Sequence, residues 1–188
     1  MEDLSLHILD IVENATAAGA TRIEVRVCED RRADRLELGI KDNGRGMDSR
    51  MVARVRDPFV TTRTTRRVGM GLPLLEQSAR EAGGDLEIRS TPGAGTEVIA
   101  RFQASHIDRR PLGDMAETMI ALILGHPAVD FSFEHRVDDR ATRFDTRELR
   151  EQLEEVPITD ARVLELIRDL LSRPPAGERE AGGGEDDE

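Results

Sequence analysis

The run KDNGRGM at residues 41–47 constrains the fold and chemistry of this chain more than any other stretch. It follows residues 36–40, whose alternating apolar side chains predict a half-buried strand. Its two glycines allow close backbone approach and positive φ, and the carboxylate of Asp42 can accept hydrogen bonds from an amino group. Asp-Asn-Gly is also common in turns that lead into a helix. Taken alone, the run predicts a ligand-binding loop and a helix-capping turn equally well.

A polar stripe lies on the helix that we predict ahead of this loop. Apolar residues between positions 4 and 15 recur at helical spacing, which predicts one buried face. Asp10 and Asn14 lie one turn apart on the flank of that helix and point the same way. Most such stripes are solvated edges. The small side chains of Ala17 and Ala18 leave room for a bulky group alongside, which favours a ligand-facing stripe.

A basic, threonine-rich segment with a second glycine pair follows the loop at residues 58–71 (PFVTTRTTRRVGMG). Gly69 and Gly71 lead into a helix predicted over 72–82, with Pro73 in the first turn, where its missing N–H has no helical partner to lose. The free N–H groups of a helix N-terminus suit a phosphate group. Gly-x-Gly before a helix is by itself a weak signal for phosphate binding.

Alternating apolar residues predict two hairpins in the first part of the chain, 21–28 with 35–40 and 85–90 with 96–102. The second part has a different pattern and no evident site. There we predict a helix over 113–124, a strand from 129 with a partner near 143, and helices over 145–155 and 159–172. Residues 174–188 are rich in Gly, Pro and Glu with almost nothing to bury, which predicts a disordered acidic tail.

Composition excludes several classes of protein. The net charge of −11 argues against non-specific nucleic-acid binding, and the absence of Trp and Tyr argues against a base-stacking platform. The single Cys28 cannot form an intramolecular disulfide. No apolar run approaches the roughly 20 residues that a membrane helix needs. We therefore expect a cytoplasmic protein without a nucleic-acid or membrane partner.

The polar stripe, the loop and the glycine pair, in this order and spacing, resemble the Bergerat-fold ATP-binding domain of the GHKL superfamily, which includes gyrase, Hsp90, histidine kinases and MutL. The resemblance covers residues 1–104, and residues 57–75 (DPFVTTRTTRRVGMGLPLL) are most similar to a histidine kinase catalytic domain. It implies an α+β fold, a two-layer α/β sandwich in which helices cover a mixed, mainly antiparallel sheet. Residues 105–173 would then form a small accessory α/β extension.

The resemblance also implies ATP and Mg²⁺ as ligands and assigns residues to them. Asn14 would give its side-chain oxygen to Mg²⁺, which prefers oxygen ligands, and Asp42 would accept the adenine amino group. Asp10 holds the position of the general base, where ATPases and kinases of this superfamily usually have Glu. Aspartate is one methylene shorter, so binding is better supported than hydrolysis. The other nucleotide-binding residues would be Gly44, Gly46, Met47, Thr62, Arg63, Gly69, Met70, Gly71, Leu72 and Thr96.

Three functions fit these motifs. The first is transfer of the γ-phosphate to a partner protein, as in a histidine kinase or an anti-sigma-type serine kinase. Because no helix pair with a phosphoacceptor histidine precedes the domain, we expect a stand-alone ATP-binding protein. The alternative is a non-catalytic switch, in which ATP orders residues 58–71 and so controls partner binding. A dimerisation-coupled ATPase is least favoured, because such proteins have longer lids and transducer domains.

Overall fold

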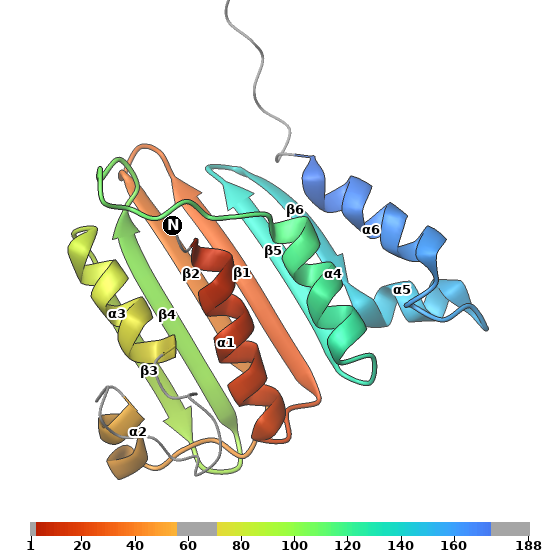
Figure 1. Ribbon diagram of the computed structural model, residues 1–188, viewed down its shortest axis with the longest axis horizontal. Helices are drawn as coiled ribbons and strands as arrows, with labels where there is room; N and C mark the ends of the chain where they lie inside the picture. The colour runs from red at the N-terminus through yellow and green to blue at the C-terminus, as the bar shows by residue number, and fades with distance from the viewer. Residues whose placement is uncertain (1–2, 56–70, 174–188) are drawn as a thin grey trace, which may run out of the picture.

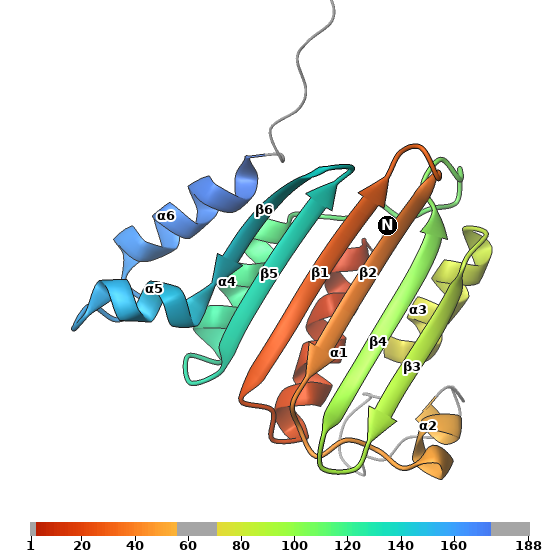
Figure 2. The same ribbon diagram turned by 180° about the vertical axis from the view of Figure 1, so that it is seen from behind.

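The computed structural model describes residues 3–55 and 71–173 of the chain. Six strands form one sheet in the order β3-β4-β2-β1-β5-β6. In Figure 1, helices α1, α3 and α4 lie over one face of this sheet. Figure 2 shows the opposite face, over which no described helix lies. The expected α+β architecture of one helical layer on one mixed sheet is confirmed.

The strands reproduce the predicted hairpins. They are β1 (Arg22–Asp30), β2 (Arg35–Asp42), β3 (Asp85–Thr91), β4 (Gly95–Gln103), β5 (Asp130–Val137) and β6 (Arg140–Asp145). β1 pairs with β2 and β3 pairs with β4, both antiparallel, and β2 joins the two hairpins by pairing antiparallel with β4. Among the strands in the described ranges, β1 and β5 form the one parallel pair. Antiparallel pairing therefore dominates the sheet, as expected.

The helices also lie close to their predicted positions. They are α1 (Leu4–Ala17), α2 (Ser49–Val55), α3 (Gly71–Glu81), α4 (Met115–Gly125), α5 (Thr146–Leu153) and α6 (Ala161–Ser172). Three of the later helices begin where an aspartate caps the first turn, and Asp114 for example accepts a hydrogen bond from the Glu117 N–H. None of the helices in the described ranges is long and apolar enough to cross a membrane.

One hydrophobic core lies between the sheet and its helical layer. Ile8 and Val12 of α1 are fully buried there, against strand residues such as Leu38. Phe131 of β5 and Met119 of α4 belong to the same cluster. The segment after residue 104 thus extends the sheet and the core of the first part, and the domain boundary at 104/105 stays a prediction.

The uncovered sheet face, which we call the open face, is charged. Strand alternation directs every second side chain to this face. Arg101 on it contacts three carboxylates, with 3.1 Å from its Nε to Glu37 Oε2, 3.0 Å from its Nη2 to Glu87 Oε2 and 3.4 Å from its Nη1 to Asp85 Oδ1. Arg26 Nη2 lies 2.9 Å from Glu97 Oε1. Arg101 of β4 is therefore neutralised by acids on the two strands beside its own, and Arg26 of β1 by an acid two strands away on β4.

Candidate functional site

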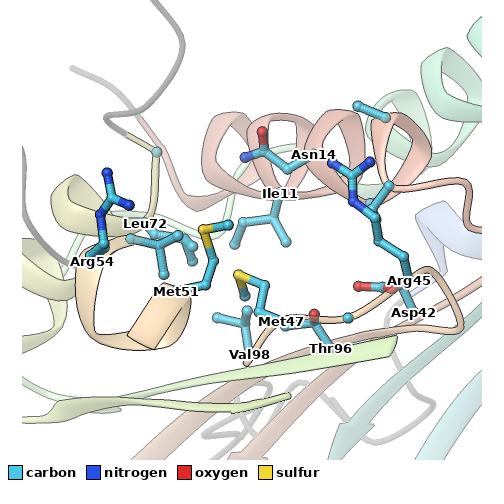
Figure 3. Close-up of a pocket in the computed structure, with 16 residues that line it drawn as sticks. Ile11, Asn14, Asp42, Arg45, Met47, Met51, Arg54, Leu72, Thr96 and Val98 are labelled. Carbon is cyan, nitrogen blue, oxygen red and sulfur yellow. The ribbon is translucent and has the colours of Figure 1, made fainter. Parts of the chain in front are cut away.

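A pocket opens on the helical side of the sheet, at the end where β2 finishes (Figure 3). It is lined by Ile11, Asn14, Ala15, Ala17 and Ala18 of α1, by Asp42 and Arg45–Met47 of the following loop, by Met51, Arg54 and Val55 of α2, by Gly71 and Leu72 of α3, and by Thr96 and Val98 of β4. Apolar walls with a few convergent polar groups are typical of small-molecule sites.

Asp42 is the last residue of β2 and is half-buried in this pocket. Its Oδ1 accepts a hydrogen bond from the Gly44 N–H at 2.7 Å. Burial raises the pKa of the carboxyl group above its usual value, while hydrogen bonds from the backbone N–H groups of Gly44 and Thr96 lower it. A carboxylate held in this way keeps further acceptor capacity for a donor in the pocket.

The loop after Asp42 is fixed to its surroundings by backbone contacts. Asn43 Oδ1 accepts hydrogen bonds from the N–H groups of Thr21 and Arg22, both at 2.9 Å. The Arg45 N–H donates to the Ala18 carbonyl at 3.0 Å, at the end of α1. The position of Asp42 is therefore set by the fold.

The structure also separates the two roles that the sequence left open for residues 41–47. The cap of α2 is Asp48, whose Oδ1 accepts a hydrogen bond from the Met51 N–H at 2.8 Å. Asp42 makes no such contact with α2 and lines the pocket. The geometry therefore favours the ligand-loop interpretation for Asp42, while the helix-capping function falls to a residue outside the run.

Two glycines interlock this loop with the β3–β4 turn. Gly46 has φ of +65°, and a Cβ placed on it would lie 2.0 Å from the Thr91 carbonyl oxygen. Gly95 has φ of +95°, and its Cβ would lie 1.9 Å from the Asp42 carbonyl oxygen. Only glycine fits either position, because both the positive φ and the close backbone contact exclude a side chain. The requirement for Gly46 thus comes from the neighbouring turn.

A hydroxyl pair supports the loop from β3 and β4. The Met47 N–H donates to Ser90 Oγ at 2.8 Å, and Ser90 Oγ lies 2.9 Å from Thr96 Oγ1. Thr96 lines the pocket next to Asp42, as its predicted supporting role requires. In the sequence Ser90 is an ordinary strand residue, and no motif there indicates that it supports the loop.

Asp10, Asn14 and Gly71 come together where α1 meets α3. Asn14 lines the pocket and lies above its middle in Figure 3. A Cβ on Gly71 would lie 2.9 Å from Asp10 Cβ and 3.2 Å from Asp10 Oδ2, so the first residue of α3 packs directly against Asp10. Asp10 itself lies beside the pocket lining. Asp10 of the polar stripe and Gly71 of the glycine pair, 61 positions apart in the chain, therefore meet at one place.

The site fits Mg²⁺ held jointly with a ligand. In residues 3–55 and 71–173, no group of three or more His, Cys, Asp or Glu side chains could hold a metal ion alone. Mg²⁺ is usually bound through one or two protein oxygens, with water and substrate phosphates completing its coordination. The side-chain oxygen of Asn14 in the pocket lining suits that arrangement.

The predicted site residues fall into three groups. Seven line the pocket: Asn14, Asp42, Gly46, Met47, Gly71, Leu72 and Thr96. Gly44 lies buried behind Asp42, where a Cβ would come within 3.1 Å of the Ala18 carbonyl oxygen, and Asp10 lies at the edge. Thr62, Arg63, Gly69 and Met70 lie outside the described residues, as does the predicted tail at 174–188.

The pocket also contains residues that sequence reasoning had not assigned to a site. Ile11 and Val98 lie in elements that were predicted only to contribute to the core, and Met51 was assigned no role, but the side chains of all three form the apolar wall of the pocket. Arg45 and Arg54 line the pocket with cationic side chains. Neither arginine stands in a recognisable motif, so only the fold could place them there.

The part of the chain that contains the pocket is similar to known proteins. The family model for histidine kinase-, DNA gyrase B- and HSP90-like ATPases matches residues 2–106. The sensor protein kinase FleS of Pseudomonas aeruginosa is 44% identical over 89 residues, 47% of this chain and 22% of FleS. The sensor histidine kinase YxdK of Bacillus subtilis is 35% identical over 107 residues, 53% of this chain and 32% of YxdK. The match thus spans less than a third of either kinase.

Among solved structures, the Aquifex aeolicus MutL ATPase domain complexed with ADP aligns with a TM-score of 0.47 at 21% identity. The alignment covers 82% of this chain and 68% of that domain.

Proposed function

The chain belongs to the histidine kinase-, DNA gyrase B- and HSP90-like ATPase family, and on this basis we propose that its pocket binds ATP together with Mg²⁺. Family membership supports ATP as the ligand. The observation that carries the proposal for this chain is the half-buried carboxylate of Asp42, which is fixed by the Gly44 N–H and faces an apolar pocket. A purine base with an exocyclic amino group has the matching chemistry.

The pocket has two ends, which we assign to the two parts of the nucleotide. Asp42 and Thr96 lie toward one end and Leu72 toward the other, with Asn14 between them (Figure 3). Adenine would donate its amino group to Asp42. The phosphates would extend toward the first turn of α3, where free N–H groups and the helix dipole favour anions. Asn14 would hold Mg²⁺, which neutralises phosphate charge when bound.

We further propose that the γ-phosphate is passed to a partner protein. The two relatives are named as sensor kinases, and this chain matches part of each of them. This similarity supports a kinase-like role. Asp10 packs against Gly71 at the phosphate end, where its carboxylate would accept the proton of the attacking group. Catalysis of this kind depends mainly on positioning and charge neutralisation, which one pocket and one metal can supply.

A nucleotide-controlled switch is the second candidate, and one contact favours it. Glu13, on the flank of α1 next to Asn14, lies 2.9 Å from His126 at the end of α4. This hydrogen-bond contact between Glu13 Oε1 and His126 Nε2 ties the helix that carries Asp10 and Asn14 to the segment after residue 104. A shift of α1 on nucleotide binding would be passed to α4 and to a partner bound there.

One experiment separates these functions. The full chain is incubated with Mg²⁺ and ATP labelled in the γ-phosphate, alone and with proteins that co-purify with it, and Asp42→Asn serves as the matched control. Label on a partner, lost in the control, supports phosphoryl transfer. Binding without label transfer or phosphate release supports the switch. Release of phosphate that depends on protein concentration indicates the dimerisation-coupled ATPase, and no ATP binding at all would overturn the proposal.

A further inference from the structure

Arg54 of α2 is a cation without a partner in the part of the chain that the structure describes. Many other arginines that the structure describes are paired, as with Arg26 and Glu97 at 2.9 Å and Arg80 and Glu76 at 2.6 Å, whereas Arg45 and Arg50 also lack an ion pair among the described residues. The guanidinium of Arg54 makes no ion pair or side-chain hydrogen bond with residues 3–55 or 71–173. A charge that the fold itself does not neutralise is available to a ligand.

The Arg54 side chain contributes no buried contact or ion pair to the described part of the fold. α2 spans seven residues and buries none of them, and Arg54 is exposed in its last turn. Its side chain nevertheless lines the pocket, together with Gly71 and Leu72 of α3. In Figure 3 Arg54 and Leu72 lie at the same end, opposite Asp42.

A cation at that end of the pocket would offset negative charge in addition to Mg²⁺. A triphosphate carries several negative charges, and the carboxylate of Asp10 already lies against Gly71. The cationic residues in the described pocket lining are Arg45 and Arg54, and Arg45 belongs to the loop at the Asp42 end. Guanidinium groups bind phosphate oxygens through short, charge-assisted hydrogen bonds and often in pairs.

We propose that Arg54 is a nucleotide-contacting residue that binds the terminal phosphates, so that α2 supplies the cation opposite Asn14 and the first turn of α3. This inference rests on the proposed ATP site. It assigns a ligand contact to α2, whose other pocket residues, Met51 and Val55, only form part of the apolar wall. It also predicts discrimination by phosphate number, since a contact to the terminal phosphates is absent from a nucleotide that lacks them.

The neighbouring Arg50 provides a matched control. It lies on the same helix, is exposed and carries the same charge, but does not line the pocket. Calorimetric titrations of the full chain with ATP, ADP and AMP, each with Mg²⁺, are compared for wild type, Arg54→Ala, Arg54→Lys and Arg50→Ala. Thermal unfolding of each variant without nucleotide checks that the fold is intact.

The expected result is a loss of ATP affinity of about tenfold or more in Arg54→Ala, a smaller loss for ADP and no change for AMP. Arg54→Lys should recover part of the ATP affinity because it keeps the charge without the planar donors. Arg50→Ala should bind all three nucleotides as wild type does.

Equal losses for ATP and AMP, or no loss for either, would overturn the role of Arg54. An equal loss in Arg50→Ala would reduce the effect to general surface charge and would also overturn it. If wild type itself fails to bind ATP, the proposed function fails first, so the two failures are distinguishable.

Discussion

The two faces of the sheet use charge in opposite ways. On the open face, Arg101 lies within 3.1 Å of Glu37 and 3.0 Å of Glu87, so its charge is satisfied inside the fold. On the helical face, Asp42 is half-buried with backbone N–H partners only, and Arg54 has no partner among the described residues. Ion pairs therefore link Arg101 to neighbouring strands of the open face, whereas Asp42 and Arg54 line the pocket without an ion pair among the described residues.

This contrast makes separable predictions for the two faces. Removing a charge from the open face should lower stability and leave ligand binding intact. Removing a charge from the pocket should weaken ATP binding and leave stability intact or raised. Marginal stability often coexists with sites of this kind, because a desolvated charge that waits for a ligand destabilises the empty fold.

The largest effect is expected for Asp42→Asn. The amide replaces the charged acceptor and presents a donor toward the adenine amino group, so a charge-assisted hydrogen bond of about 1.5–3 kcal/mol is lost. ATP affinity measured by calorimetry should therefore fall at least about tenfold. Unchanged affinity would show that Asp42 does not bind the base.

A smaller effect, confined to the metal, is expected for Asn14→Ala. ATP contacts along the pocket remain, but the side-chain oxygen for Mg²⁺ is gone, so Mg²⁺ should no longer raise ATP affinity. Titrations with and without Mg²⁺ measure this directly. Glu13→Ala, which alters the neighbouring side chain that contacts His126, should keep the Mg²⁺ dependence of wild type. An unaltered response to Mg²⁺ in Asn14→Ala would exclude Asn14 as the ligand.

The open face should respond in the opposite way. Arg101→Ala removes a network of ion pairs at the surface of the sheet and should lower the free energy of unfolding by about 1 kcal/mol. Denaturant titration measures the loss. ATP affinity should equal that of wild type, and a change in affinity would break the distinction between the two faces.

The smallest effect is a gain in stability for Asp42→Asn. Burial raises the pKa of Asp42 in the folded state above its unfolded value, so the charged form destabilises the fold at neutral pH. This destabilisation is present above the folded pKa and disappears as the pH falls below the unfolded pKa. The melting temperature of the Asn variant should therefore equal or exceed that of wild type at pH 7, and the difference should shrink toward pH 4. A lower melting temperature of Asp42→Asn than of wild type at pH 7 would contradict the prediction that the charged carboxylate destabilises the fold.

Local pattern in the sequence was enough to predict the strands and helices. The alternation of Leu36, Leu38 and Ile40 predicted β2, and Asp42, which was predicted to bind the ligand, is the last residue of this strand. The second-half strand from 129 and its partner near 143 appear as β5 and β6. Their attachment to β1 could not be read from the sequence, because parallel pairing across some 100 residues leaves no local pattern.

The candidate site was predictable only where its residues stand in motifs. Asn14 and Gly71 belong to such motifs and line the pocket, while their predicted roles toward Mg²⁺ and nucleotide stay predictions. Ser90 and Arg54 do not, because a strand serine and an exposed helix arginine are common in any chain. Their proximity to the loop and to α3 depends on tertiary packing. The need for glycine at position 46 likewise arises from the turn at Thr91, far along the chain.

The most direct test of the account compares ATP with inosine triphosphate, which has a carbonyl oxygen in place of the adenine amino group. Both nucleotides are titrated with Mg²⁺ into the full chain by calorimetry, for wild type and Asp42→Asn. Because the Asp42 carboxylate accepts from the amino group and opposes a carbonyl, wild type should bind ATP at least about tenfold more tightly, and the variant should lose this preference. Equal affinity of wild type for the two nucleotides would contradict the assignment of Asp42 as the base-reading residue.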